Sequence, residues 1–187
     1  MARCSTCQPP CGGWGGCGGG PPGRSPPPAV AVPGKLAPLL EGLVAVHVAT
    51  RDAALVPDEV MAAAALLEPD GRSLTVYLPD ATSETALANL RGNGAIAVVL
   101  SQPLTHRTMQ LKGRVETLRA AREDERDAVE RLAAAFDAEV AAIGLPPAAL
   151  RRRTRWPCTA ATFAVLEAYE QTPGPRAGEP LAPEEPR

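Results

Sequence analysis

The middle of the chain is dominated by short apolar runs that alternate with polar residues or stand between turn residues. Alternation with a period of two is typical of strands with one buried face, whereas a continuous short apolar run favours a strand buried on both faces. Residues 95–101 form such a continuous apolar run, whereas apolar and polar residues alternate over the long stretch 106–118. The pattern predicts about six strands, at residues 43–50, 59–68, 73–78, 95–101, 106–118 and 159–168.

The segment 59–68 is ambiguous, because its alanines favour a helix by intrinsic propensity. It leads into Pro69-Asp70-Gly71, a turn sequence, and a clear strand follows that turn. Two strands around a turn form a hairpin, and we therefore predict a strand here.

Helical patterns occupy the remaining segments of the middle. Residues 82–91 can be capped by Thr82 and closed by the residues 92–94. Apolar residues recur at helical spacing over residues 120–143, and a short helical lead-in is expected at residues 35–41. We predict a mainly β fold with α-helices, in which a closed or nearly closed antiparallel barrel has its helices packed outside.

The two ends of the chain differ in composition from its middle. Residues 1–34 contain nine Gly, eight Pro and four of the five cysteines, and we expect a disordered arm there. The folded domain is expected over residues 35–170, and a Pro-rich extended tail over residues 171–187.

Two alternatives for the arm stay open. Its cysteines could form a metal site, although only half of the usual zinc spacing is present, so we expect no metal. Translation could instead begin at Val30 or Val32, so that the arm is not made. The cysteines concerned are Cys4, Cys7, Cys11 and Cys17.

Composition and charge narrow the class of protein. Only 3% of the residues are aromatic against 45% hydrophobic, so the core must be built from Ala, Val and Leu. Such a core buries little area per residue, which favours a dimer interface or a bound cofactor as added support. No apolar run approaches the ~18 residues that span a bilayer. The net charge of −2 offers no basic stripe for nucleic acid, and we expect a cytoplasmic protein with neither kind of partner.

Two features of the middle could carry chemistry. On the strand 106–118, Thr108, Gln110, Lys112 and Arg114 share one face, and such groups suit a phosphorylated ligand that bears an amide. The alternative is the ordinary polar side of a half-exposed strand. The helix start at residues 82–85 offers free N–H groups and hydroxyls to an anion, with simple capping as the alternative.

These features lie in a stretch that resembles a known family. The runs VYLPDATSETALANLRGNGAIAVVL and HRTMQLKGRVETL are similar to the pyridoxamine 5'-phosphate oxidase-like family. The resemblance implies a split β-barrel that forms a homodimer and binds FMN across the subunit interface. No metal is expected in the domain, and no catalytic acid or base stands out in the sequence. Carried onto this sequence, the implied cofactor contacts are Ser83, Thr85, Arg107, Thr108, Gln110 and Lys112.

The sequence departs from the family pattern at several places. Glu84 and Thr85 stand where the oxidase has two basic residues, and a carboxylate beside a phosphate lowers affinity. The flavin strand of the family corresponds to the Ala-rich VMAAAALL, and the C-terminal Trp and Arg pattern that closes over the vitamer is absent. Oxidation of that vitamer is therefore not expected.

The leading hypothesis is an FMN-binding flavoprotein, an oxidoreductase-like member whose substrate the sequence does not identify. The first alternative is a non-enzymatic carrier or sensor that holds haem or deazaflavin on the same barrel. The second is an interaction module in which the barrel serves only as a scaffold for the two arms.

Overall fold

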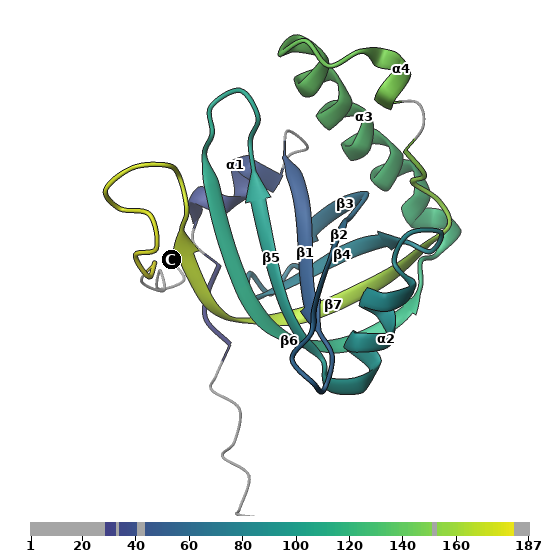
Figure 1. Cartoon of the computed structure of the whole chain (residues 1–187), viewed down its shortest axis with the longest axis vertical. Helices are drawn as coiled ribbons and strands as arrows, with labels where there is room; N and C mark the ends of the chain where they lie inside the picture. Colours follow the sequence, from purple (N-terminus) through teal and green to yellow (C-terminus); the bar gives the residue numbers. More distant parts are fainter. Residues whose placement is uncertain (1–28, 33, 41–43, 151–152, 182–187) are drawn as a thin grey trace, which may run out of the picture.

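The computed structural model describes residues 29–32, 34–40, 44–150 and 153–181. Within these ranges the fold is mainly β, with helices at its periphery (Figure 1). The elements in chain order are η1 (Gly34–Leu36), α1 (Ala37–Leu40), β1 (Ala45–Arg51), β2 (Pro57–Met61), β3 (Ala64–Leu67), β4 (Ser73–Pro79), α2 (Glu84–Asn93), β5 (Ala95–Ser101), β6 (Thr108–Ala120), η2 (Glu123–Glu125), α3 (Arg126–Ala142), α4 (Pro147–Leu150) and β7 (Cys158–Glu170).

All seven strands form one antiparallel sheet in the order β2-β1-β5-β6-β7-β4-β3. The two outermost strands, β2 and β3, follow each other directly in the chain. Ala62 between them donates its N–H to Val46 of β1, and Ala63 donates to Tyr77 of β4, each at 2.8 Å. The sheet is therefore curled into a half-barrel, which confirms the predicted split-barrel class.

The predicted segment 59–68 is two strands rather than one, so the sheet has one strand more than the six expected. Its hairpin with β4 is confirmed, because β3 pairs with β4 from Leu67 opposite Leu74. Asp70 holds the turn by accepting from the N–H groups of Arg72 and Ser73 at 2.7 and 2.8 Å. The buried alanines 62–65 let the chain cross from one sheet end to the other, and this tertiary role overrides their helix propensity.

The core lies inside the curled sheet. Met109 and Leu111 of β6 point into it, as do Val98 and Leu100 of β5, so the predicted alternation along β6 is confirmed. The short helical lead-in also contributes, since Leu36 and the leucines of α1 are buried in the same cluster.

The two helices predicted in the middle of the chain are present, but both begin later than expected and α2 also ends later, at Asn93. Gly94 closes α2 with φ 67°, as expected of a left-handed C-cap. The residue at the N-cap is Ser83 rather than Thr82, and its side chain makes no capping bond. The long helix α3 begins at Arg126 because residue 120, where we expected its start, still belongs to β6.

At both ends of the described chain, residues outside the predicted domain 35–170 form hydrogen bonds to it. Val30 donates its N–H to Val165, and Val32 donates to Gly71, each at 2.8 Å, so packing begins before residue 35. Residues 171–181 are not extended but return to the sheet, where Leu181 donates to Ala168 at 2.8 Å. The four arm cysteines and residues 182–187 lie outside the described residues. None of the helices in the described ranges is long and apolar enough to cross a membrane.

Candidate functional site

The outer face of β1, β5, β6 and β7 carries three of the six predicted cofactor residues, Thr108, Gln110 and Lys112. Figure 1 shows β5 and β6 from a side on which no helix covers them. The strand registers place Lys112 beside Ala97 on β5 and Glu167 on β7. The next row places Gln110 beside Val99 and Tyr169. Small side chains on β5 thus lie next to the polar row of β6.

Lys112 is held at the edge of this face by two groups of β7. Its ammonium lies 3.6 Å from Glu167 and 4.5 Å from the centre of the Tyr169 ring. The Tyr169 hydroxyl donates to the same carboxylate at 2.6 Å, and this hydrogen bond raises the pKa of Tyr169. The Lys112 side chain is nevertheless 43% exposed, so a ligand can reach it.

The beginning of β6 borders a hollow. Thr108 donates its N–H to the Thr172 hydroxyl at 3.0 Å, and this bond ties β6 to the returning C-terminal loop. The exposed Arg107 lies at the rim of the hollow, whose volume is about 430 Å³. Its lining consists of Arg107, Glu170, Thr172, Pro173, Gly174, Pro175 and Arg176.

The other predicted contacts, Ser83 and Thr85, lie at the start of α2. Thr85 is exposed, but the Ser83 hydroxyl is buried and has no hydrogen-bond partner within the described ranges. The ten residues of α2 span about 15 Å at 1.5 Å per residue. It is the far end of α2 that meets β6, where Arg114 donates to the Asn93 carbonyl at 2.8 Å. The structure therefore places Thr108, Gln110 and Lys112 on one strand with Arg107 directly before it, but it does not bring Ser83 and Thr85 to them within one protomer.

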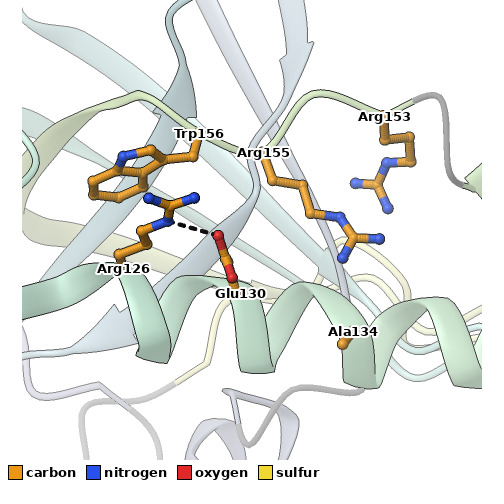
Figure 2. A pocket seen from close by; sticks show the side chains of 6 residues that line it. All are labelled: Arg126, Glu130, Ala134, Arg153, Arg155 and Trp156. Atoms are coloured by element: carbon orange, nitrogen blue, oxygen red, sulfur yellow. Dashed lines mark hydrogen bonds and ion pairs between the residues drawn. The ribbon is translucent and has the colours of Figure 1, made fainter. Parts of the chain in front are cut away.

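A second hollow, which we call the arginine groove, was not anticipated from the sequence. It lies between α3 and the segment before β7 and has a volume of about 670 Å³ (Figure 2). Its lining consists of Arg126, Glu130, Ala134, Arg153, Arg155 and Trp156. A sequence signal for it existed, because three of these residues stand one helical turn apart and the others are consecutive or nearly so.

The described residues contain little that could act as an acid, a base or a nucleophile. Burial raises the pKa of the Cys158 thiol to about 12, which keeps it protonated and unreactive. His47 forms a hydrogen bond with Glu59 at 2.7 Å, and His106 lies exposed in the loop before β6. No group of three or more metal-binding side chains occurs within the described ranges.

Comparisons with known proteins concern the fold. Neither a family model nor a curated protein matches the sequence. The solved structure of HupZ from Group A Streptococcus matches with a TM-score of 0.50 and 17% identity, over 77% of this chain and 97% of that chain.

Two further structures match less closely. A putative pyridoxamine 5'-phosphate oxidase from Lactobacillus delbrueckii has a TM-score of 0.48 and 14% identity, over 74% of this chain and 93% of that chain. An F420 reductase has a TM-score of 0.47 and 20% identity, over 73% of this chain and 98% of that chain. One of these two structures bears the name of the kind of protein that the sequence resembles. At 17% identity, the likeness to HupZ shows the fold alone.

Proposed function

We propose that this chain binds FMN on the outer face of β6 and serves as a flavoprotein of the oxidoreductase-like kind. The observation that carries the proposal is the line of Thr108, Gln110 and Lys112, which runs from the hollow at Arg107 onto the open face of β5 and β6. The sequence resemblance, the fold and this line of side chains all support the same class of ligand.

The chemistry of the side chains on β6 fits such a cofactor. Arg107 and Arg176 line the hollow and can neutralise a phosphate. The Gln110 amide can both donate to and accept from the edge of a heterocycle. On the neighbouring strand β5, Ala97 and Val99 are half-buried, and their side chains are small enough to leave a flat surface beside the polar side chains of β6. When bound, the flavin would supply the redox chemistry, while the protein positions and shields it.

A second copy of the chain would complete the site. The outer face of β5 and β6 is uncovered, and covering it would bury more of an Ala-rich and Val-rich surface. Thr85 cannot join the β6 residues within one protomer, and a partner subunit is the route by which it could do so. A homodimer with the cofactor at its interface is therefore part of the proposal.

The test is a titration of the purified protein with FMN, followed by absorbance, with the oligomeric state measured by light scattering. We expect saturable binding in the micromolar range and a dimer. Arg107→Gln should weaken binding about ten-fold or more, because a charge-assisted hydrogen bond to phosphate is lost. Arg131→Gln is the matched control, since Arg131 is exposed on α3, which packs against β3 rather than against this face. An equal loss of FMN affinity in both variants, or the absence of saturable FMN binding by the parent protein, would rule the proposal out.

One observation favours a different occupant of the same barrel. The Ser83 hydroxyl is closed off from solvent, and its neighbours are Glu84 and Thr85 rather than basic residues, which weakens that end of α2 as a phosphate site. The second candidate is therefore a non-enzymatic carrier or sensor of deazaflavin or haem. Spectroscopy of the molecule that co-purifies identifies the occupant, and stopped-flow mixing with NAD(P)H separates a reducible enzyme cofactor from a carried one.

A further inference from the structure

The arginine groove is built from two elements that face each other. Arg126, Glu130 and Ala134 follow one another at successive turns of α3, and Figure 2 shows the segment from Arg153 to Trp156 running opposite them. At about 670 Å³ the hollow falls in the range of roughly 300–1,000 Å³ that is common for small-molecule sites. No residue of this groove belongs to the face of β6.

One end of the groove carries a surplus of positive charge. Arg153 and Arg155 both bind the carboxylate of Asp137, so one carboxylate serves two guanidinium groups. At the other end, Arg126 binds Glu130 at 2.8 Å and Glu123 at 3.1 Å. The end around Arg153 and Arg155 is therefore short of one negative charge.

Arg153 in particular lacks a full set of good acceptors. Among the described residues, one of its nitrogens contacts Asp137 at 3.2 Å, and another contacts the Met61 sulfur at 3.0 Å, which is a weak acceptor. Its guanidinium also lies 5.0 Å from the centre of the Phe136 ring. Burial lowers the pKa of Arg153, as expected of a cation that has lost much of its hydration. An oxyanion in the groove would supply the acceptor that the protein does not.

Trp156 gives the opposite end of the groove a flat wall. The guanidinium of Arg126 lies 5.9 Å from the centre of the Trp156 ring, and Figure 2 shows the two side chains facing each other at the mouth of the groove. Planar rings stack on tryptophan and arginine alike, so this end favours an aromatic group. Figure 2 shows Glu130, which is bound to Arg126, between the two ends, whereas Ala134 lies below Arg155, where its small side chain leaves the floor open.

We propose that the arginine groove binds a small phosphate monoester attached to a planar ring, the class to which nucleoside monophosphates belong. The phosphate lies between Arg153 and Arg155, and the ring lies against Trp156 and Arg126. This site is separate from the face of β6 and goes beyond the proposed flavin function. It accounts for two arginines that share one carboxylate beside an open hollow.

Trp156 allows a direct test in the full-length protein. The chain has two tryptophans, so Trp14→Phe leaves Trp156 as the single reporter. The probes are AMP, adenosine and inorganic phosphate, and FMN is avoided because it would report on β6 as well. We expect AMP to change the Trp156 emission saturably, with adenosine and phosphate each at least about ten-fold weaker. Equal responses to AMP and either partial probe, or no saturable response, would overturn the proposal.

A substitution on the floor of the groove separates binding from folding. Ala134 is exposed, so Ala134→Glu places a bulky carboxylate in the groove without disturbing the core. It should weaken AMP binding at least about ten-fold at an unchanged melting temperature. Ala142→Glu, the same change at the exposed last residue of α3, is the matched control and should bind AMP like the parent protein. If Ala134→Glu binds as tightly as Ala142→Glu, the groove is not the site.

Discussion

Glu125 shows how single residues fasten the elements together. Its carboxylate accepts hydrogen bonds from Arg119 of β6 at 2.6 Å, from the N–H of Arg122 at 2.7 Å and from the Tyr77 hydroxyl at 3.1 Å. The bond from Arg119 is the main reason that the pKa of Glu125 falls to about 2. With only 11% of its side chain exposed, Glu125 connects the end of β6, the start of α3 and β4.

This network predicts a defined pH dependence. A carboxyl whose folded pKa lies below its usual 4.5 stabilises the fold above that pH and loses this contribution as the pH falls toward about 2. We expect Glu125→Gln to lower the free energy of unfolding by about 2–3 kcal/mol at neutral pH. The variant should also flatten the acid loss of stability in urea unfolding curves. Glu116→Gln, at an exposed position of β6, is the control, and an unchanged acid profile for Glu125→Gln would contradict the prediction.

Removal of the Ser83 hydroxyl, unlike loss of the Glu125 carboxylate, is not expected to destabilise the protein. Its hydroxyl is buried without a hydrogen-bond partner within the described ranges, so it costs free energy in the isolated protomer. We expect Ser83→Ala to leave the stability of the cofactor-free protein unchanged or to raise it by up to about 1 kcal/mol. Ser101→Ala is the comparison, because that hydroxyl bonds Thr108 at 2.9 Å and its loss should destabilise the protein. Calorimetric melting measures the stability of both variants. If Ser83→Ala loses more stability than Ser101→Ala, the Ser83 hydroxyl has a hydrogen-bond partner and the prediction is wrong.

At the scale of elements, β6 owes its bend to Gly113. The register between β6 and β7 shifts between Lys112 and Gly113, and a second shift follows after Val115. A Cβ at Gly113 would overlap the carbonyl oxygen of Ala164 and would lie 2.7 Å from a ring carbon of Phe163. Only a residue without a side chain lets the two strands approach this closely.

We therefore expect Gly113→Ala to destabilise the fold by about 3 kcal/mol or more, because backbone and a core ring must both move. Gly92→Ala in α2 is the matched control. A Cβ there meets nothing within 4 Å, so the added helix propensity should stabilise by about 0.5–1 kcal/mol. Chemical unfolding of the two variants measures both free energies of unfolding. If Gly113→Ala lowers this free energy only slightly, β6 and β7 can move apart without loss of stability, which contradicts the prediction.

The elements also show what the sequence could and could not predict. The apolar run 95–101 corresponds to β5 at both ends. The expected burial on both faces was wrong, because alternate residues of β5 are only half-buried on the open outer face of the sheet. The alternation along β6 predicted which side chains face the core. The division of 59–68 into β2 and β3 was missed, since it depends on strands β1 and β4 that are distant in sequence. The arginine groove was missed for the same reason, because its two walls come from separate segments.

At the scale of the whole molecule, the open outer sheet face makes the proposed dimer testable. Ala97 lies at the centre of this face and is half-buried, so a charge there should not enter the core. We expect Ala97→Glu to shift the protein from dimer to monomer and to weaken FMN binding, because the carboxylate, although it lies beside Lys112, would lose its hydration in the interface. Light scattering at several concentrations measures the shift, with Ala142→Glu as control. An Ala97→Glu protein that stays dimeric would place the interface elsewhere.

The position of β7 has a consequence for biosynthesis. This strand is the last in chain order, yet it lies between β6 and β4 in the sheet. While the ribosome is still working toward residue 158, the nascent polypeptide can assemble only two separate pieces, one made of four strands and one made of two. Each piece then presents an unpaired edge, which is a hazard for association between growing chains. Synthesis halted before this strand would leave both edges open, because β7 is the strand that joins the two pieces into one sheet.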